Sequence, residues 1–520
     1  MKKSKTSSII GISSATFLSR ILGLIREQIF AFLLGATNFA DAFLVAFRIP
    51  NLLRDLFAEG ALSTSFIPTF TQYVLKKGEK KAFYLSNLVI NFLIMVIGFL
   101  IILGYIFTPQ IVRFMAPGFS LFPEKFSLTI MMTKILLPFL LFVSLASVFM
   151  GMLNVYHKFF IPAFAPAMFN LTIILGGLII FLISPSSHQK AVLWAMAAFV
   201  GGFIQLAIQI PSACRLGYKY KFCFDLKFKE EGLKRIFNLM LPAIIGLAAV
   251  QINIIINTML ASFLPTGSVS YLNYAFRLIQ FPIGLFGVAI ATVTTAYISR
   301  DIVKNDISQL NKNIADSLKL NSFLSFPALV YFFLLGQLII ELLFEHGQFK
   351  PRDTLFTYQT LQFYCLALFF YSGVKIMAPV FYAANKSHIA VISSISAVVT
   401  NLAVSLSTYR VMGVKGLALG LSCGSFVNFL VLSFNYTRHF GWIKDQNILS
   451  GIGKHALAAI VMGIAGLSLY QWLKGYKIIV SATGTIILCG GFYFFLNYLF
   501  KSAELEKFFR IIKSFIKKKK

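Results

Sequence analysis

Long apolar runs, each of about 18 residues or more, recur from one end of this 520-residue chain to the other. A backbone inside a bilayer must satisfy its own hydrogen bonds, which leaves helices and closed barrels as the spanning structures. The alternating pattern of barrel strands is not visible. The sequence therefore predicts an all-α polytopic membrane protein with about fourteen transmembrane helices. The predicted spans are approximately residues 8–34, 38–60, 83–107, 128–153, 161–183, 191–212, 236–264, 271–298, 320–344, 355–383, 388–409, 416–436, 453–473 and 479–500.

Charge is sparse but strongly one-sided: 12% of the residues are charged, and the net charge is +29. If the N-terminus is cytoplasmic, the tails and loops of that face hold 31 of the 47 Lys and Arg residues, and the opposite loops hold nine. This bias follows the positive-inside rule and predicts that both termini lie in the cytoplasm. The net positive charge is therefore explained by membrane topology, and no nucleic-acid partner is expected.

The longest polar break, residues 213–235, separates six predicted spans from eight. It predicts an N-terminal lobe, a cytoplasmic linker, a C-terminal lobe, two extra helices and a basic cytoplasmic tail. Their predicted bounds are residues 1–213, 214–235, 236–437, 438–500 and 501–520, in that order. The tail resembles an interfacial basic helix, which anionic lipids attract.

Two segments, each in the second helix of its half, align without gaps. They are "AFRIPNLLRDLFAEGALS" (46–63) and "AFRLIQFPIGLFGVAIAT" (275–292), and the alignment places Arg48 opposite Arg277. An even number of spans per repeat relates two halves by an axis along the membrane normal. This pattern predicts two pseudo-symmetric six-helix lobes plus two extra C-terminal helices. Transporters of this class bind substrate between the lobes.

Charged side chains interrupt the first two apolar helices, where an Arg costs roughly 2.5–3.5 kcal/mol at the bilayer centre. Arg20 and Glu27 share one face of the first helix, and Asp41, Arg48 and Asp55 share one face of the second. One interpretation is internal salt bridges, for example Arg20 with Glu27. Arg48 with Asp41 is another such pair.

The other interpretation is a cationic cavity between the lobes that binds a phosphate-bearing substrate. Arg277 and Lys375 are further cations with no acid nearby in their own helices. A buried cation without a counter-charge is costly, and a bound anion would complete it. Arg also supplies forked donors that match phosphate oxygens. We find no nucleotide loop, metal-ligand spacing or hydrolase-like pairing, so no catalytic residue, metal or cofactor is expected.

Two long stretches resemble the MurJ (MviN) family of lipid II flippases. They are "SRILGLIREQIFAFLLGATNFADAFLVAFRIPNLLRDLFAEGALSTSFIPTF" (19–70) and "LPAIIGLAAVQINIIINTMLASFLPTGSVSYLNYAFRLIQFPIGLFGVAI" (241–290). "VKIMAPVFYAANKSHIA" (374–390) and "GLALGLS" (416–422) fit the same family, so the resemblance covers essentially the whole chain. It implies the fold of the multidrug/oligosaccharidyl-lipid/polysaccharide (MOP) exporters. It also implies alternating-access movement of lipid II, a lipid-linked peptidoglycan precursor, to the outer leaflet of the bacterial cytoplasmic membrane for cell-wall synthesis.

The resemblance also implies functional residues. Those implied to hold the substrate's pyrophosphate are Arg20, Arg26, Arg54 and Arg277. Those expected to line or gate the cavity are Asp41, Arg48 and Glu59, with Lys375 added because it lies deep in its span. The chain departs from the family at Phe276 and Gln280, where many members carry acids, and at Asp55, where a second basic residue is common. Its cavity charge balance is therefore expected to differ.

Several alternatives stay open. The chain is expected to be a transporter rather than an enzyme, but it fits an exporter of another lipid-linked oligosaccharide or a related multidrug-type exporter. A non-transporting scaffold for cell-wall enzymes is a different class, and it predicts tolerance of cavity substitutions. The expected partners are lipid II, anionic lipids and the cell-wall synthesis machinery. Coupling to the membrane potential or to a monovalent cation is open.

Overall fold

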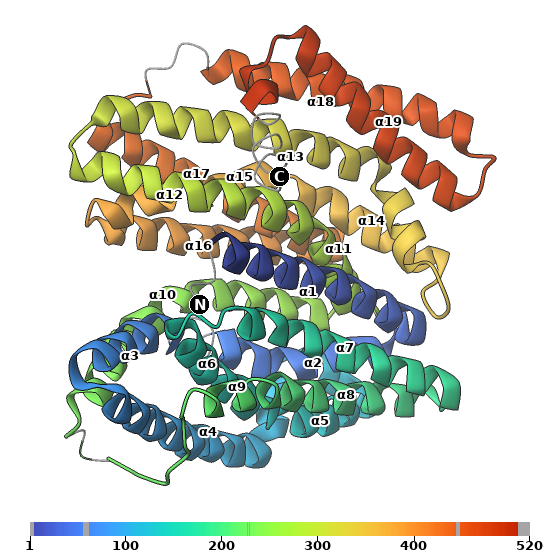
Figure 1. The fold of residues 1–520 in the computed structure, drawn as a ribbon. Coiled ribbons are helices and arrows are strands. Elements are labelled where there is room, and N and C mark those ends of the chain that lie inside the picture. The colour runs from blue at the N-terminus through green and yellow to red at the C-terminus, as the bar shows by residue number, and fades with distance from the viewer. Residues whose placement is uncertain (1–4, 56–61, 226, 228, 444–447, 508–520) are drawn as a thin grey trace. The chain divides into compact units, whose positions relative to one another are not determined.

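The computed structural model describes residues 5–55, 62–225, 227, 229–443 and 448–507, and the side chains of residues 5–13, 242–243 and 245–250 are outside the description. Every regular element in these ranges is a helix (Figure 1), which confirms the all-α prediction. The chain divides into two compact units. The first unit is Met1–Ser270 with His346–Phe349, and the second is Tyr271–Glu345 with Lys350–Lys520.

The first unit contains the helices α1 to α10. They are α1 (Lys5–Leu34), α2 (Asn38–Leu53), α3 (Ser63–Lys77), α4 (Glu79–Met115), the 3₁₀ turn η2 (Pro117–Leu121), α5 (Pro123–Leu136), α6 (Phe139–Val155), α7 (Phe160–Ile183), α8 (Ser187–Ala207), α9 (Ile210–Cys214) and α10 (Glu231–Ser262).

The remaining helices belong to the second unit, apart from the first residues of α11. They are α11 (Ser268–Pro282), the π-helix η3 (Ile283–Gly287), α12 (Val288–Val303), α13 (Ile307–Phe344), α14 (Pro351–Cys365), α15 (Leu368–Ala383), α16 (Ser387–Met412), α17 (Val414–Phe440), α18 (Ile448–Leu473) and α19 (Ile478–Leu499).

Ten helices within the described ranges are long and apolar enough to cross a membrane, and the bent pair of α14 and α15 raises the number to eleven. This confirms a polytopic helical membrane protein but not the predicted count of about fourteen. The other three predicted spans coincide with α1, α2 and α10. Of these, α2 continues directly into the π-helical residues Arg54 and Asp55.

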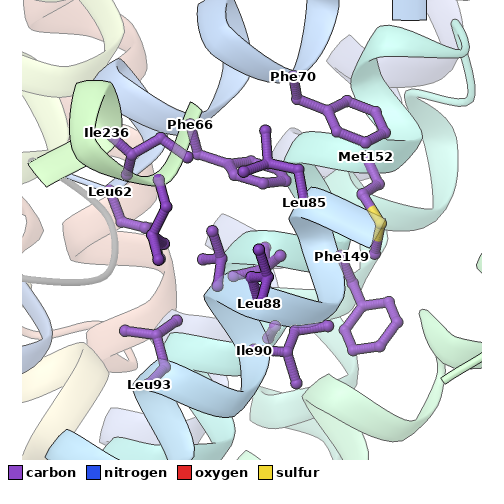
Figure 2. Packing of buried hydrophobic residues seen from close by; sticks show 14 of the residues in the cluster. Leu62, Phe66, Phe70, Leu85, Leu88, Ile90, Leu93, Phe149, Met152 and Ile236 are labelled. Atoms are coloured by element: carbon purple, nitrogen blue, oxygen red, sulfur yellow. The ribbon is translucent and has the colours of Figure 1, made fainter. Parts of the chain in front are cut away.

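Apolar side chains from α3, α4, α6 and α10 form a core of the first unit (Figure 2). Phe66 and Phe70 of α3 are fully buried and stack with their ring centroids 5.3 Å apart. Leu85 of α4 and Ile236 of α10 are buried in the same cluster. Helix α10 therefore packs within the first unit, although it follows the polar segment 214–235. The predicted division of the chain at that segment stays a prediction.

A short loop from later in the chain also belongs to the first unit. Residues His346–Phe349 group with it, while the flanking α13 and α14 do not. The backbone N–H of Gln348 donates to the carbonyl of Phe32, 2.9 Å away. Gly347 has a φ of +62°, and a Cβ there would collide with the carbonyl oxygen of Phe32. Both the backbone angle and the close approach therefore require glycine.

Close contacts between neutral groups join several long helices of the second unit. Gly420 and Gly424 let α17 approach α16 so closely that a Cβ at either glycine would touch the α16 backbone or Asn401. Helices α18 and α19, red in Figure 1, run side by side. Tyr493 of α19 donates to the carbonyl of Phe323 in α13 at 2.8 Å. Such small-residue packing and interhelical hydrogen bonds replace the hydrophobic effect, which is absent between helices in lipid.

The two aligned segments both change helical form at corresponding residues. In the first segment Arg54 and Asp55 are π-helical, and in the second Ile283–Gly287 is π-helical. In the gap-free alignment Arg54 and Asp55 stand opposite Ile283 and Gly284. π-helical turns are rare and concentrate at functional sites. Their shared position supports the internal repeat seen in the sequence.

Candidate functional site

The charged face of α1 contains one compact cluster. Arg26 donates through one terminal nitrogen to Asn170 Oδ1 at 3.0 Å and through the other to Glu27 Oε1 at 2.5 Å. Asn170, on α7, also donates to the carbonyl of Ser19 at 3.1 Å. The suggested pair of Arg20 with Glu27 is therefore wrong, because Glu27 pairs with its chain neighbour. This cluster joins α1 to α7 and neutralises Arg26 locally.

Arg20 lies one and a half turns earlier on α1 and is exposed. No hydrogen bond or ion pair to its guanidinium is found among the described residues, unlike Arg26. Its side chain lines a cavity of about 380 Å³ inside the first unit. Arg20 is thus available to an anion from outside the protein.

Asp41 is the most completely satisfied charge in this region. Its Oδ2 accepts from Lys125 Nζ at 2.9 Å and from the backbone N–H of Gly267 at 2.8 Å. Its Oδ1 accepts from the backbone N–H of Ser270 at 3.0 Å and from the Ser270 hydroxyl at 2.7 Å. A carboxylate at the start of α11 also interacts favourably with the helix dipole. The suggested pair of Asp41 with Arg48 is wrong, since Lys125 takes that place.

Arg48 instead donates to the hydroxyl of Thr258 on α10 at 2.6 Å. That hydroxyl donates in turn to the carbonyl of Ile254, so it acts as donor and acceptor together. The bond spans 210 residues of sequence and fastens α2 to α10. Arg48 therefore has a structural contact within the first unit.

Arg54 forms the third ion pair, at the π-helical residues within the first segment. Its Nε and a terminal nitrogen both donate to Asp55 Oδ1, at 3.2 and 2.9 Å. The amide of Gln251 reaches Asp55 Oδ2 at 3.4 Å. Both side chains keep part of their surface exposed, at 23% for Arg54 and 32% for Asp55. The pair therefore remains accessible to a competing anion.

The two cations predicted in the second half of the chain lie in the second unit. Arg277 is exposed and donates to Gln280 Oε1 of its own helix at 3.4 Å. Lys375 is half-buried and places its ammonium 5.3 Å from the ring centre of Tyr371, one turn earlier on α15. The remaining predicted residue, Glu59, lies outside the described residues. The described residues hold no group of three or more His, Cys, Asp or Glu side chains arranged for a metal ion.

The sequence analysis did not find the residues that bond to Asp41, Arg26 and Arg48, which are Lys125, Asn170 and Thr258 in that order. Lys125 lies between the predicted spans 83–107 and 128–153, where no buried partner was expected, but it is buried against Asp41. Asn170 and Thr258 lie in apolar helices and gave no charge signal of their own. A polar residue within an apolar span is the available signal, because its side chain needs a hydrogen-bond partner in lipid.

A buried histidine was missed as well. His455 of α18 is fully buried, with Nδ1 2.8 Å from Ser322 Oγ and Nε2 3.0 Å from Ser502 Oγ. Its Nε2 also lies 3.4 Å from Glu504 Oε2. Burial alone would raise the pKa of Glu504, but the hydrogen bonds from His455, the backbone and Ser502 outweigh it and lower the pKa to about 2. Glu504 is thus ionised and fixes the segment after α19.

The architecture defines a class first. The fold matches an inward-facing multidrug resistance MATE family transporter of the MOP superfamily with a TM-score of 0.69 at 15% identity, covering 84% of this chain and 99% of that one. It matches a structure described as lipid II flippase MurJ in the inward closed conformation more closely, with a TM-score of 0.80 at 27% identity, covering 94% and 98%. The fold is therefore that of the MOP-superfamily transporters.

Sequence relatives narrow the class to a family. The family model described as lipid II flippase MurJ matches residues 30–484. A probable lipid II flippase MurJ of Buchnera aphidicola is 35% identical over 426 residues, which is 82% of each chain. One from Vibrio cholerae is 32% identical over 455 residues, covering 85% of this chain and 86% of the relative. The chain belongs to the MurJ family.

Proposed function

We propose that this protein is a flippase that moves lipid II from the inner to the outer leaflet of the bacterial cytoplasmic membrane by alternating access, for cell-wall synthesis. The single observation that carries this proposal is the family match over residues 30–484, which includes nearly every helix. Relatives named as lipid II flippases at 30–35% identity support it, and so does the shared fold. The protein is a transporter and not an enzyme.

The charges give the proposal a physical basis. A pyrophosphate cannot enter hydrocarbon without donors that replace its hydration. Arg20 offers an uncompensated guanidinium, while Arg26 and Arg54 are already paired with carboxylates. Each guanidinium has five donors, so Arg26 and Arg54 keep donors for an arriving phosphate. Exchange of a carboxylate for a phosphate oxygen would let the substrate bind and leave without exposing a bare buried charge.

The finer architecture is part of the same proposal. It comprises fourteen spans, two pseudo-symmetric six-helix lobes and two further helices, α18 and α19, that accommodate the polyprenyl tail. Both termini lie in the cytoplasm, since this places most of the Lys and Arg residues on that side. Anionic lipids and the cell-wall synthesis machinery are proposed partners. Coupling to the membrane potential or to a monovalent cation is proposed as the energy source.

Depletion of the protein in its host tests this function directly. The expected result is accumulation of lipid-linked precursor in the inner leaflet, measured by an assay that modifies only outer-leaflet headgroups. Re-expression should restore outer-leaflet precursor. Normal outer-leaflet levels during depletion would overturn the proposal.

Two rivals give different outcomes. An exporter of another lipid-linked oligosaccharide shares the pyrophosphate chemistry, and its depletion would leave the peptidoglycan precursor distributed normally while another glycan accumulates. A scaffold would tolerate Arg20→Ala but lose function when residues 501–520 are deleted.

A further inference from the structure

Helix α4 has a lipid-facing surface that begins with two asparagines. Residues 88–107 are a run of 20 residues, apolar or aromatic apart from Asn91, which is long enough to cross the hydrocarbon core. Asn87 lies one turn before Asn91 on the same helical face. Ile94 and Tyr105 continue that face and are exposed, at 38% and 40%. This face therefore meets lipid further along α4, and asparagines on it need a cover.

The chain between α9 and α10 supplies that cover (Figure 1). Residues 218–224, which we call the strap, run along α4 and leave Asn87 and Asn91 buried, at 3% and 1% exposure. The hydroxyl of Tyr218 donates to Asn87 Oδ1 at 2.6 Å, and Asn87 Nδ2 donates to the carbonyl of Lys219 at 3.1 Å. Both polar groups of this asparagine are thereby satisfied within the first unit.

The same pattern repeats one helical turn further along. The hydroxyl of Tyr220 donates to Asn91 Oδ1 at 2.5 Å. Asn91 Nδ2 is shared between the carbonyls of Lys221 and Cys223, at 3.1 and 3.0 Å. Two residues of extended chain advance about 6.6 Å and four helical residues about 6 Å, so alternate tyrosines of the strap meet successive turns of α4. The strap is thus held in register along the helix.

These bonds place the exposed phenylalanines of the strap at the edge of the apolar run. Cys223 is bonded to Asn91, which lies three residues, or about 5 Å, inside the start of that run. Phe222 and Phe224 flank Cys223, and they are 77% and 42% exposed. Their ring centroids are 4.9 Å apart. Apolar rings at this depth meet acyl chains rather than bulk water, as in interfacial membrane anchors.

The strap also presents positive charge. Lys219 and Lys221 are exposed, and Lys80 is exposed on the same face of α4 as the two asparagines. The long stems of these lysines let the ammonium groups reach phosphates while the rings lie deeper. The first acid after the strap, Asp225, accepts from the backbone N–H of Glu230 at 2.6 Å and belongs to the turn before α10. A surface that is both cationic and apolar fits an anionic lipid leaflet, whereas an acidic soluble protein would match its charge but not the depth of its rings.

We propose that the strap docks on anionic phospholipids of the leaflet that borders this end of α4. Phe222 and Phe224 enter the boundary of the acyl chains, and the lysines bind lipid phosphates. One lysine near an anionic surface contributes about fivefold to binding, so Lys219 and Lys221 together contribute about 25-fold. The proposed topology identifies this leaflet as the cytoplasmic one, and the inference goes beyond the proposed transport activity.

Fluorescence quenching in the full chain locates the strap. Phe222→Trp supplies the reporter, after the three native tryptophans are replaced by phenylalanine. The protein is reconstituted in mixed vesicles of phosphatidylcholine and phosphatidylglycerol, in which one lipid or the other carries bromine atoms on its acyl chains. Bromine quenches tryptophan only at short range, so the quenching shows which lipid touches the reporter. Phe99→Trp is the matched reporter, because Phe99 is exposed in the middle of the apolar run of α4.

The expected result is quenching of Phe222→Trp by both brominated lipids, with brominated phosphatidylglycerol several-fold more effective per molecule. Phe99→Trp should be quenched equally by the two lipids. Changing Lys219 and Lys221 to glutamine, or raising the salt concentration, should remove the preference for phosphatidylglycerol at Phe222→Trp. Both lysines are exposed, and a monodisperse elution profile verifies that the variant folds.

A second pair of lysines is the control for net charge. Lys474→Gln with Lys477→Gln removes the same charge from exposed residues of the loop before α19. This variant should keep the preference for phosphatidylglycerol at the strap, because the lost charges are not part of the docking surface.

Three results would overturn the inference. A Phe222→Trp reporter that neither lipid quenches would place the strap in water, as for a loop that docks a soluble acidic protein. Quenching without preference would show that the strap lies on lipid of any charge. A preference that survives in the folded variant without Lys219 and Lys221 would mean that other groups select the lipid. None of these results touches the proposed function, which the leaflet assay in cells tests independently.

Discussion

The segments 46–63 and 275–292 have similar sequences, but the described residues of the two have different surroundings. Each leaves the α-helical form at the same aligned position. At that position the first segment carries the Arg54–Asp55 ion pair, whereas the second has Ile283, which is buried. The two copies therefore share the position at which a π-helical turn begins, while the Arg54–Asp55 ion pair belongs to the first copy.

The aligned arginines differ in the same way. Arg48 is half-buried and bonded to Thr258 on another helix, whereas Arg277 is exposed and bonded to Gln280 on its own helix. A guanidinium fixed by a distant helix contributes to folding. An exposed guanidinium, by contrast, can be reached by a ligand. The comparison teaches that equivalent positions in a repeat need not have equivalent roles.

The largest expected effect separates these two arginines. Arg277→Ala should abolish translocation while membrane insertion survives, and Arg20→Ala and Arg26→Ala should do the same. Losing charge-assisted hydrogen bonds worth about 3 kcal/mol weakens substrate binding about 100-fold. The measurement is growth of depleted cells that express each variant, with membrane levels checked by immunoblot.

Arg48→Ala is the matched control for Arg277→Ala. It should lower thermal stability in detergent through the lost bond to Thr258, by about 1.5–3 kcal/mol, and still translocate in the fraction that folds. Normal growth supported by the Arg20, Arg26 and Arg277 variants together would refute the assignment of the pyrophosphate site.

The next effect concerns the start of α2. Asp41→Asn leaves Lys125 buried without its counter-charge, so we expect a loss of about 3–5 kcal/mol in the free energy of unfolding. The double variant Asp41→Asn with Lys125→Met removes both charges and should recover most of it. Thermal unfolding in detergent measures all three proteins. Equal losses in the single and double variants would show that the backbone bonds to Gly267 and Ser270, rather than the ion pair, dominate.

Much of this arrangement was predictable from single helices. The apolar runs placed the helices, and the spacing of Arg20 and Glu27 showed that one face of α1 is polar. The pairing was not predictable, because helical periodicity compares residues only within one helix. Asp41 finds Lys125 at a separation of 84 residues, and its other partners are backbone N–H groups, which carry no sequence signal.

The positions of the π-helical turns could not be predicted from the sequence either. Pro50 is the proline of the first segment, yet the aligned position in the second is Ile279, and the π-helix there follows Pro282. A π-helical turn depends on packing by neighbouring helices, and propensities of single residues do not encode it. The cavity beside Arg20 was likewise invisible, since its walls come from helices that are distant in sequence.

A smaller effect tests the packing of the π-helix η3 in the second segment. Gly287 packs so closely on Ser372 that a Cβ would lie 2.6 Å from the Ser372 hydroxyl and 3.0 Å from its Cβ. Gly287→Ala should therefore destabilise the protein by about 1–3 kcal/mol through overpacking, and adding Ser372→Gly should relieve it. Gly98→Ala is the control, because open space surrounds that glycine. A neutral Gly287→Ala would mean that the break is not held by this contact.

The smallest expected effect comes from Asp55. It decides whether the Arg54–Asp55 pair at the π-helical residues of segment 46–63 binds substrate or is structural. Asp55→Asn removes the carboxylate that competes for Arg54, and since both side chains are partly exposed, the loss of stability should be about 1 kcal/mol or less. If Arg54 binds the pyrophosphate, removal of this competing carboxylate should make a pyrophosphate lipid bind more tightly, and the gain should shrink as salt is raised. Binding is measured by the lipid's ability to raise the melting temperature. An unchanged affinity would place Arg54 with Arg48 as a structural cation, and Arg277 would then be the only one of the three arginines in these segments still assigned to the substrate.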